Sequence, residues 1–441
     1  MRIFVALGAF LGLLASTRVA QAGNLDAFYL SGDAALIGGA ITATARGGGS
    51  AWYNPAGLGH LRGLRLDASV NGYTLDFGSS PEIVNSDPNA KLEKLSSLDL
   101  TVVPAALTLT GRFGNVGVAL GVFVPSQSTT ILRSKVSVSD EDGDLAFAYD
   151  LYSRYQEYHV GPSFGWAPTD DLTLGASALV TYRTLQHIED AFVSLEPGNI
   201  AVLSHYTRDW IQVGLELIVG MQWRVSSRLR MGAVVRTPAI RLGQDLQEVE
   251  AEVTAVRGLL DSAVNFSGNL GIEAAVVAPA RLHAGFAYDL DKWRFAIDGS
   301  LQVPMKNDSL SLDLRPVLNM RLGATRQIND RFGVGGGIFT DRSPSRTPTT
   351  FGQSQLDFYG LTAGVTTGKL YKVISRGAED LKEPHGLLFQ TTVALSYALG
   401  VGTIVSAEVA AGPGGLLTYR DVPANIVAHE ISVHLASTIA E

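Results

Sequence analysis

Two short segments carry residue types and spacings that could support chemistry. Gly161-Pro162-Ser163-Phe164-Gly165 matches the pattern of a hydrolase nucleophile, which needs a serine on a turn between a strand and a helix. Here the serine lies inside alternating apolar and polar residues, so the match predicts a strand and no nucleophile. Asp140 to Asp144 is similar to a calcium-binding loop. Its glycine is misplaced and no glutamate stands at the twelfth position, so it predicts a solvated loop.

The glycines and histidines give no stronger signal. Gly333 to Gly337 lacks the strand and helix that flank a dinucleotide-binding loop, and predicts a close approach or a kink on a strand. The eight histidines show no ligand spacing, and His283 and His434 fall on the polar faces of predicted strands. The chain has no cysteine, which excludes disulfides and thiolate metal sites. We therefore predict no catalytic residue, no metal and no cofactor.

The triplet Asn54-Pro55-Ala56 has a conformational signature instead of a chemical one. Proline fixes its own φ and biases the preceding residue toward an extended backbone, while an asparagine amide can bond to neighbouring main chain. By its chemistry alone this is an ordinary turn, since Asn-Pro is a common turn initiator.

The elements that carry these residues follow from composition and periodicity. Of 441 residues, 46% are hydrophobic and 17% charged, with 48 glycines and a formal net charge of −8. A disordered chain is excluded, and the acidic balance argues against nucleic acid as a partner. Beyond residue 22 no window offers 18 uninterrupted apolar residues, so membrane-spanning helices are not predicted.

The dominant pattern has a period of two residues, which is typical of strands with one apolar and one polar face. It is clearest over 172–183, 211–223, 229–236, 281–289 and 292–303. Very short connections such as Ser226-Ser227 and Asn329-Asp330 join antiparallel neighbours, whereas 78–98, 125–143, 304–313, 341–354 and 369–385 are predicted as long polar loops. We expect about fourteen strands.

Aromatic residues distinguish a membrane barrel from a soluble β-protein. All of the following lie beside a short turn and in phase with the apolar face: Trp166, Trp223, Tyr288, Trp293 and Phe332. Tryptophan and tyrosine prefer the membrane–water interface, so this ring predicts a transmembrane antiparallel β-barrel.

The N-terminal residues differ from the rest. Arg2, an apolar run over Ile3 to Ala15 and the sequence Ala20-Gln21-Ala22 predict a signal peptide over residues 1–22, cleaved after Ala22. Residues 23–63 are rich in glycine and alanine and lack sustained alternation. Because small residues let the backbone pack closely, this segment suits the inside of a barrel, which residues 64–441 would form.

At this point the sequence resembles a known family. Ser31-Gly32-Asp33 through Tyr53-Asn54-Pro55-Ala56-Gly57-Leu58 is similar to the N-terminal hatch of the FadL family of outer-membrane transporters for long-chain fatty acids and aromatic hydrocarbons. The likeness continues more diffusely over 229–238, 293–303 and 320–337. It implies a fourteen-stranded barrel, an N-terminal hatch plugging the lumen, and a hydrophobic ligand route to a lateral opening where one strand is kinked. Asn54, Pro55 and Ala56 are then the expected gating residues of the hatch.

The sequence thus predicts a non-enzymatic, passive transporter in the outer membrane of a Gram-negative bacterium. Its expected partners are a hydrophobic small molecule, outer-membrane lipids and the assembly machinery, and the barrel is expected to be a monomer. One alternative is a porin for small polar solutes, because these charged residues would face the lumen: Arg228, Arg230, Arg281, Asp298 and Arg321. The other is an outer-membrane enzyme such as a lipase, which needs a serine, a histidine and a carboxylate or amide at one level. We find no such set in the sequence.

Overall fold

The structure is a computed structural model that describes residues 29–79, 84–85, 99–140, 143–196, 200–256, 259–272, 274–307, 312–349, 353–372, 386–412 and 416–441. The predicted signal peptide, residues 1–22, lies outside the described residues, as does the start of the 23–63 segment up to residue 28. No helix among the described residues is long and apolar enough to cross a membrane.

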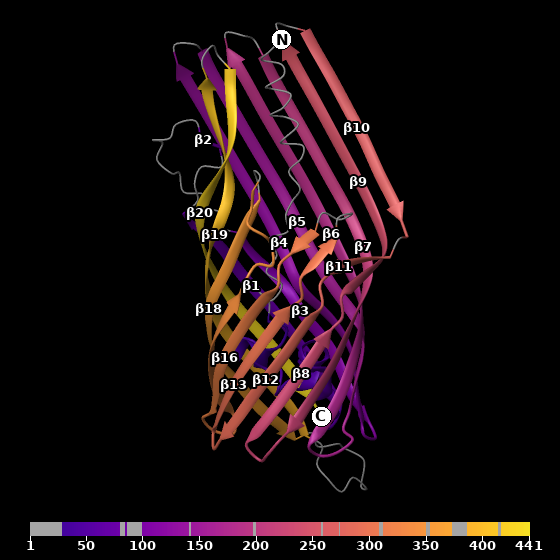
Figure 1. Ribbon diagram of the computed structural model, residues 1–441. Coiled ribbons are helices and arrows are strands. Elements are labelled where there is room, and N and C mark those ends of the chain that lie inside the picture. Colours follow the sequence, from indigo (N-terminus) through magenta and orange to yellow (C-terminus); the bar gives the residue numbers. More distant parts are fainter. Residues whose placement is uncertain are drawn as a thin grey trace.

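The chain forms a closed antiparallel β-barrel of fourteen strands (Figure 1), which confirms the predicted fold class. The uninterrupted strands are β1 (Arg65–Ser79), β3 (Asp99–Phe113), β4 (Val116–Asp140), β5 (Gly143–Trp166), β6 (Leu172–Glu196), β7 (Ile200–Arg224), β13 (Trp293–Gln302), β16 (Val317–Gln327), β17 (Phe332–Asp341), β18 (Ser354–Lys372), β19 (Gly386–Gly412) and β20 (Leu416–Ala440). Two further barrel strands are interrupted: β8 (Leu229–Arg236) continues as β9 (Ala239–Val256), and β10 (Leu259–Gly271) continues as β11 (Ala275–Ala278) and β12 (Arg281–Leu290). Pairing of β1 with β20 closes the barrel. Short strands β2 (Val84–Asn85), β14 (Met305–Asn307) and β15 (Leu312–Leu314) complete the list.

The aromatic residues of the turn end face outward as predicted. Trp166, Trp223, Tyr288, Trp293 and Phe332 are all exposed. A second set of outward tyrosines lies higher on the wall: Tyr182, Tyr359 and Tyr397. The distance between the two levels can be counted along β7. Trp223 marks the lower level, and Val213, which pairs with Tyr182, marks the upper level about ten residues away. At ~3.3 Å per residue and a tilt of ~40°, this spacing is ~25 Å, the height of an apolar band in a membrane barrel.

The wall is much taller on one side than the sequence predicted. The segment 125–143 was expected to be a loop, but β4 continues to Asp140 and β5 begins at Gly143, so this prediction was wrong. Strands β4 to β7 reach far above the upper tyrosines, whereas β12, β13, β16 and β17 are short (Figure 1). Above the band both faces are mixed in polarity, so the period-two signal fades, while backbone pairing with the neighbouring strand continues.

Residues 29–63, the described part of the hatch, lie inside the lower half of the barrel (Figure 1). They form two short α-helices, α2 (Gly32–Leu36) and α3 (Ser50–Tyr53), and two 3₁₀ turns, η1 (Gly47–Gly49) and η2 (Pro55–His60). The first is capped by Ser31, whose hydroxyl accepts from the Ala34 N–H. On one side η2 contacts β5, β6 and β7, and on the other α2 contacts β18 and β19.

A belt of glycines on the inner wall makes this close contact possible. Gly117, Gly165, Gly175 and Gly220 are direct partners across β4 to β7. A Cβ at each of them would collide with hatch residues 54 to 59, mostly with their backbone. These four positions need glycine, because only glycine leaves room for the hatch to pack so closely against the wall.

Candidate functional site

The triplet Asn54-Pro55-Ala56 joins two parts of the hatch to the wall. Asn54 is fully buried and caps η2, its Oδ1 accepting from the Ala56 N–H at 3.2 Å. Its Nδ2 donates to the Thr42 carbonyl at 2.7 Å and to the Met221 carbonyl of β7 at 3.0 Å. The predicted bond between the asparagine amide and neighbouring main chain is present, and a bond to the barrel wall accompanies it. The gating role of the triplet stays a prediction.

The middle of the hatch is held by two more lumen side chains. Gln222 on β7 donates to the carbonyls of Thr42 and Ala45, at 3.3 and 3.2 Å. Asp298 on β13 accepts from the Thr42 N–H at 2.7 Å. The backbone around Thr42 is therefore bound from opposite sides, and Asp298, which the sequence placed in a wet channel, is buried against the hatch instead.

Replacing Asn54 by alanine is expected to loosen this anchor. The change leaves the buried Ala56 N–H without its acceptor and removes a donor from the carbonyls of Thr42 and Met221, of which the first keeps its bond from Gln222. Each group left unsatisfied costs about 1–3 kcal/mol. Hydrogen exchange of residues 42–57 should accelerate, while exchange of β5 and β6 stays unchanged. Asn54→Asp keeps the acceptor for Ala56 but sets a buried carboxylate oxygen against the carbonyls of Thr42 and Met221, so it should loosen the anchor at least as much. Equal exchange in Asn54→Ala and wild type would show that the bond to Met221 does not hold the hatch.

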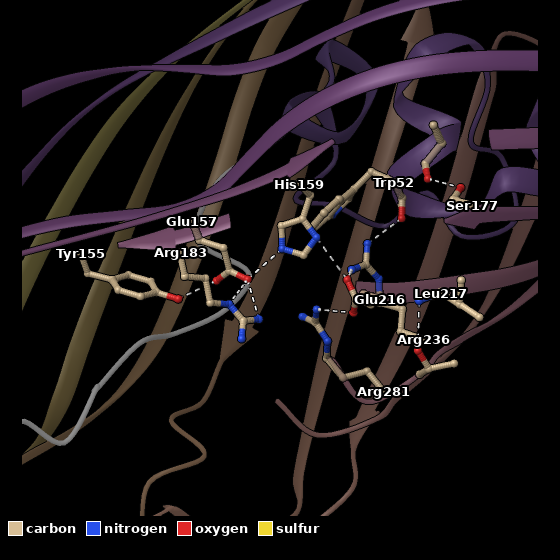
Figure 2. A network of polar contacts seen from close by, with 12 residues as sticks. Trp52, Tyr155, Glu157, His159, Ser177, Arg183, Glu216, Leu217, Arg236 and Arg281 are labelled. Carbon is tan, nitrogen blue, oxygen red and sulfur yellow. Dashed lines mark hydrogen bonds and ion pairs between the residues drawn. The ribbon is translucent and has the colours of Figure 1, made fainter. Parts of the chain in front are cut away.

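The tip of the hatch, Trp52, is clamped by an arginine of the wall (Figure 2). The Arg236 guanidinium lies 3.9 Å from the Trp52 ring centroid and donates to the Trp52 carbonyl at 2.8 Å. The other end of the same guanidinium donates to Glu216 at 3.1 Å. Ser177 adds a bond to the Ala51 carbonyl at 2.7 Å. Because Arg236 and Glu216 are both buried, their pairing is screened little by water.

Behind this clamp an ionic network continues upward along the wall. His159 lies between two carboxylates, with Nε2 2.8 Å from Glu157 and Nδ1 3.4 Å from Glu216. Arg183 donates twice to Glu157, at 2.9 and 2.8 Å, and Tyr155 donates to the same carboxylate at 2.9 Å. Arg281 lies 3.6 Å from Glu216. Figure 2 shows that these side chains come from β5, β6, β7, β8 and β12, so the network ties together strands that are distant in sequence.

An apolar cluster lies directly beside the clamp. Trp52 packs on Phe123 of β4, with ring centroids 5.5 Å apart, and edge-on against His159 at 5.0 Å. Leu30, Leu58 and Ala105 belong to the same buried cluster. The hatch tip thus presents an aromatic surface to β4, at the level where the wall is irregular.

The irregularity separates β3 from β4. These strands pair only from Ala106↔Phe123 down to Phe113↔Val116, and no pairing joins them above that level in the described residues. Both strands carry a bulge there. In β3 the bulge is at Ala105, where the register with β1 shifts between Ser69 and Val70. In β4 it lies between Phe123 and Ser126, where the register with β5 shifts. Pro104 and Pro125 stand at the two bulges, and proline has no N–H to give to a ladder. Pro104, inside a predicted strand, and Pro125, at the start of the segment predicted as a loop, were the signals that sequence reasoning missed.

Above the hatch the lumen wall carries aromatic side chains. Tyr155 on β5 and Trp210 on β7 lean toward each other across β6, with ring centroids 6.2 Å apart. Tyr206 lies one step higher, 5.9 Å from the ring of His187. Aromatic faces next to few, fixed polar groups are typical of sites that bind small hydrophobic ligands.

On the opposite wall a serine, a histidine and an amide do converge, which the sequence did not indicate. His434 Nδ1 lies 2.6 Å from Asn71 Oδ1, and its Nε2 lies 3.2 Å from Ser396 Oγ. The amide is fixed because Asn71 Nδ2 donates to the Tyr29 carbonyl at 3.2 Å. The Tyr29 ring covers His434 at 4.8 Å. Ser396 lies in β19, which is paired on both sides at this level, so the nearby backbone N–H groups are committed to the ladder and offer no oxyanion hole.

This cluster therefore anchors the start of the described hatch to the barrel wall. Burial raises the pKa of the Tyr29 phenol well above its ordinary value, so the ring stays neutral at physiological pH. Tyr29 also packs edge-on against Phe339 at 6.1 Å. The start of the described hatch is thus held by β1, β17, β19 and β20.

The structure also places the other residues that the sequence analysis singled out. Ser163 is buried inside β5, and of the Asp140–Asp144 loop residues 141 and 142 lie outside the described part. Gly333, Gly335 and Gly337 lie on β17, where the last two lie against Leu36 and Ile37 of the hatch. The described residues hold no group of three or more histidine, aspartate or glutamate side chains placed for a metal ion. Of the arginines assigned to a wet channel, Arg228 lies at an exposed turn and Arg230 pairs with Asp289 at 3.3 Å.

Comparison with solved structures identifies the fold, although the sequence identities are low. No protein-family model and no curated protein sequence matches the chain. Among solved structures it is similar to the CymD monoaromatic hydrocarbon channel, with 14% identity, a TM-score of 0.59, and 94% of this chain and 99% of that one covered. It is also similar to the toluene transporter TodX of P. putida, with 13% identity, a TM-score of 0.56 and coverage of 95% and 99%.

A third similar structure is a Pseudomonas aeruginosa FadL homologue, with 11% identity, a TM-score of 0.55, and 92% of this chain and 97% of that chain covered. The resemblance first seen in the hatch motif is thereby confirmed at the level of architecture: the chain has the fold of the FadL-like barrels.

Proposed function

We propose that this protein is an outer-membrane channel through which hydrophobic molecules pass without covalent change. The observation that carries the proposal is the position of the hatch. It fills the lower lumen with buried contacts, and its aromatic tip lies beside the place where β3 and β4 separate. A hydrophobic molecule can then leave sideways, whereas an ion or sugar meets a plugged lumen.

The route begins at the aromatic residues of the upper lumen and ends at the unpaired stretch between β3 and β4. The monoaromatic hydrocarbon channel and the toluene transporter that share this fold support a small aromatic cargo, and the resemblance of the hatch to the FadL family supports a long-chain one. Burial of apolar surface, at ~25 cal/mol per Å², would give such cargo its preference over sugars and ions. Movement of the hatch about Asn54-Pro55-Ala56 would change the width of the route at Trp52.

Uptake into liposomes tests this proposal. The protein is reconstituted and offered, in separate experiments, a labelled long-chain fatty acid, toluene and a small sugar. We expect the fatty acid or toluene to enter faster than through protein-free liposomes, and the sugar to be excluded. Free passage of the sugar without the hydrophobic compounds would establish the polar-solute porin instead.

A substitution on the outward face of β7 tests whether this part of the barrel wall lies in lipid. Val219 is 55% exposed and lies between the two aromatic levels. Val219→Arg would place a guanidinium in hydrocarbon and should lower the free energy of unfolding by ~2–4 kcal/mol in lipid vesicles. Gln212→Arg, on the lumen side of the same strand and just above the upper tyrosine level, is the control outside the apolar band and should be mild. Equal losses for the two variants would show that the faces are misassigned.

A further inference from the structure

Strand β10 is paired on one side only. It runs alongside β9 from Leu259↔Val256 to Gly271↔Gln244, and in the described part of the chain no strand pairs with its other edge. Figure 1 shows it as the outermost strand of the tall flank. Every residue from Leu259 to Leu270 is exposed. A free edge of this length presents a row of unused N–H and C=O groups to any extended chain.

The two faces of this edge have different chemistry. The register from β10 through β9 to β7 places alternate residues of β10 on the outer side. Four of them are large, apolar and exposed: Leu260, Val264, Phe266 and Leu270. The lower end of β10 aligns, through Gln244, with Gln212, just above the upper tyrosine level. The apolar residues therefore face water and not lipid, where exposed apolar surface of this kind marks an interaction site.

The lumen side of the same edge is acidic. Glu250 and Glu252 of β9 stand opposite Asn265 and Ala263 of β10, both short side chains, while Glu248 is already paired with Arg208 at 3.1 Å. A lysine or arginine on a strand added beyond β10 could lie across these short residues and reach the carboxylates. The edge therefore favours an added strand with apolar residues outward and basic residues inward.

We propose that the free edge of β10 is a docking site for an extended segment of another protein, which adds to the sheet as one more strand. Main-chain hydrogen bonds supply the affinity, and alternation of basic and apolar residues supplies the specificity. The proposal does not depend on the cargo of the channel.

Symmetry argues against a second copy of this chain as the occupant. Two β10 edges paired antiparallel are related by a two-fold axis perpendicular to the sheet. In a barrel wall this axis lies in the plane of the membrane, so the second barrel would stand upside down. Two copies inserted in the same direction cannot pair in this way.

Fluorescence anisotropy of a labelled peptide tests the docking site on the full-length protein in detergent. The probe is a peptide of about nine residues, the length of a typical added strand, that alternates lysine and valine. The controls are a peptide of the same composition with the lysines and valines in two blocks, and the alternating peptide with N-methyl groups on alternate amides. We expect only the unmodified alternating peptide to bind saturably, and more weakly as salt rises.

Substitutions test whether the peptide binds along β10. Phe266→Lys should weaken binding by about tenfold, because edge lysines oppose strand addition. Leu203→Lys, on the outer face of β7 at a similar height, should leave binding unchanged. Glu250→Gln should reduce the salt dependence. Equal binding of the block peptide, or an unchanged affinity in Phe266→Lys, would overturn the proposal. So would a concentration-dependent dimer of the protein alone that Phe266→Lys abolishes, since the edge would then belong to a second copy.

Discussion

Removal of the hatch is expected to turn a closed barrel into a water-filled pore. A variant lacking residues 24–60 should admit small sugars to liposomes at rates far above those of the intact protein. The reason lies in the inner wall, where Ser177, Gln222 and Asp298 now bond to the hatch backbone. Once exposed, these polar groups would be solvated, and a lumen of this kind conducts water and small solutes.

Liposome swelling with sugars of increasing size measures this effect. The control is Pro55→Gly, which keeps every residue of the hatch and only frees the turn, and should admit much less sugar. Circular dichroism and the shift in gel mobility on heating report whether the barrel itself remains folded. A folded but impermeable deletion variant would show that some part of the chain other than residues 24–60 seals the lumen.

Replacement of Arg236 by methionine should have the second large effect. Glu216 is buried and would keep only Arg281 at 3.6 Å and His159 at 3.4 Å. Removing one partner of a buried ion pair costs ~3–5 kcal/mol, because an uncompensated charge is left behind. The same change removes the cation over the Trp52 ring and the bond to its carbonyl, so the tip of the hatch should be released.

Denaturant unfolding in lipid vesicles gives the change in stability, and protease digestion near Trp52 reports on the hatch. Arg208→Met is the matched control, since its partner Glu248 is half-exposed and such pairs contribute at most ~1 kcal/mol. Adding Glu216→Gln to Arg236→Met should recover part of the loss, because the orphan charge is gone. Similar losses for Arg208→Met and Arg236→Met would mean that burial does not distinguish the two pairs.

The sequence was informative wherever a local pattern carried the structure. Alternation and the aromatic residues beside short turns predicted the barrel, because in lipid each strand must show one apolar face. The turn at Asn54-Pro55-Ala56 was predictable for the same reason, because proline and asparagine act on their own backbone, whereas its gating role rests on the family resemblance. Strands above the lipid were missed over 125–140, since nothing there forces the residues to alternate.

Two sets of contacts could not be predicted from local patterns: the clamp of Arg236 on Trp52, and the cluster of Asn71 and His434 that holds Tyr29. Arg236 and Trp52 are 184 residues apart, and Asn71 is 363 residues from His434. Period two tells which face a residue takes, yet it does not give the register that brings two distant strands to one height. Pro104 and Pro125 could have been read as ladder breaks, but only pairing shows that they meet at the same level.

The belt of glycines has a consequence for how this protein could evolve. At the level of Gly117, Gly165 and Gly175 the wall touches the hatch through backbone, so neither partner can be adjusted by small side-chain exchanges. Even a change to alanine would require the chain to shift. New cargo sizes must therefore be acquired higher up, around Tyr155 and Trp210, where side chains and not the main chain define the width. Substitutions around Tyr155 and Trp210 are therefore tolerated far more easily than substitutions where the hatch meets the wall.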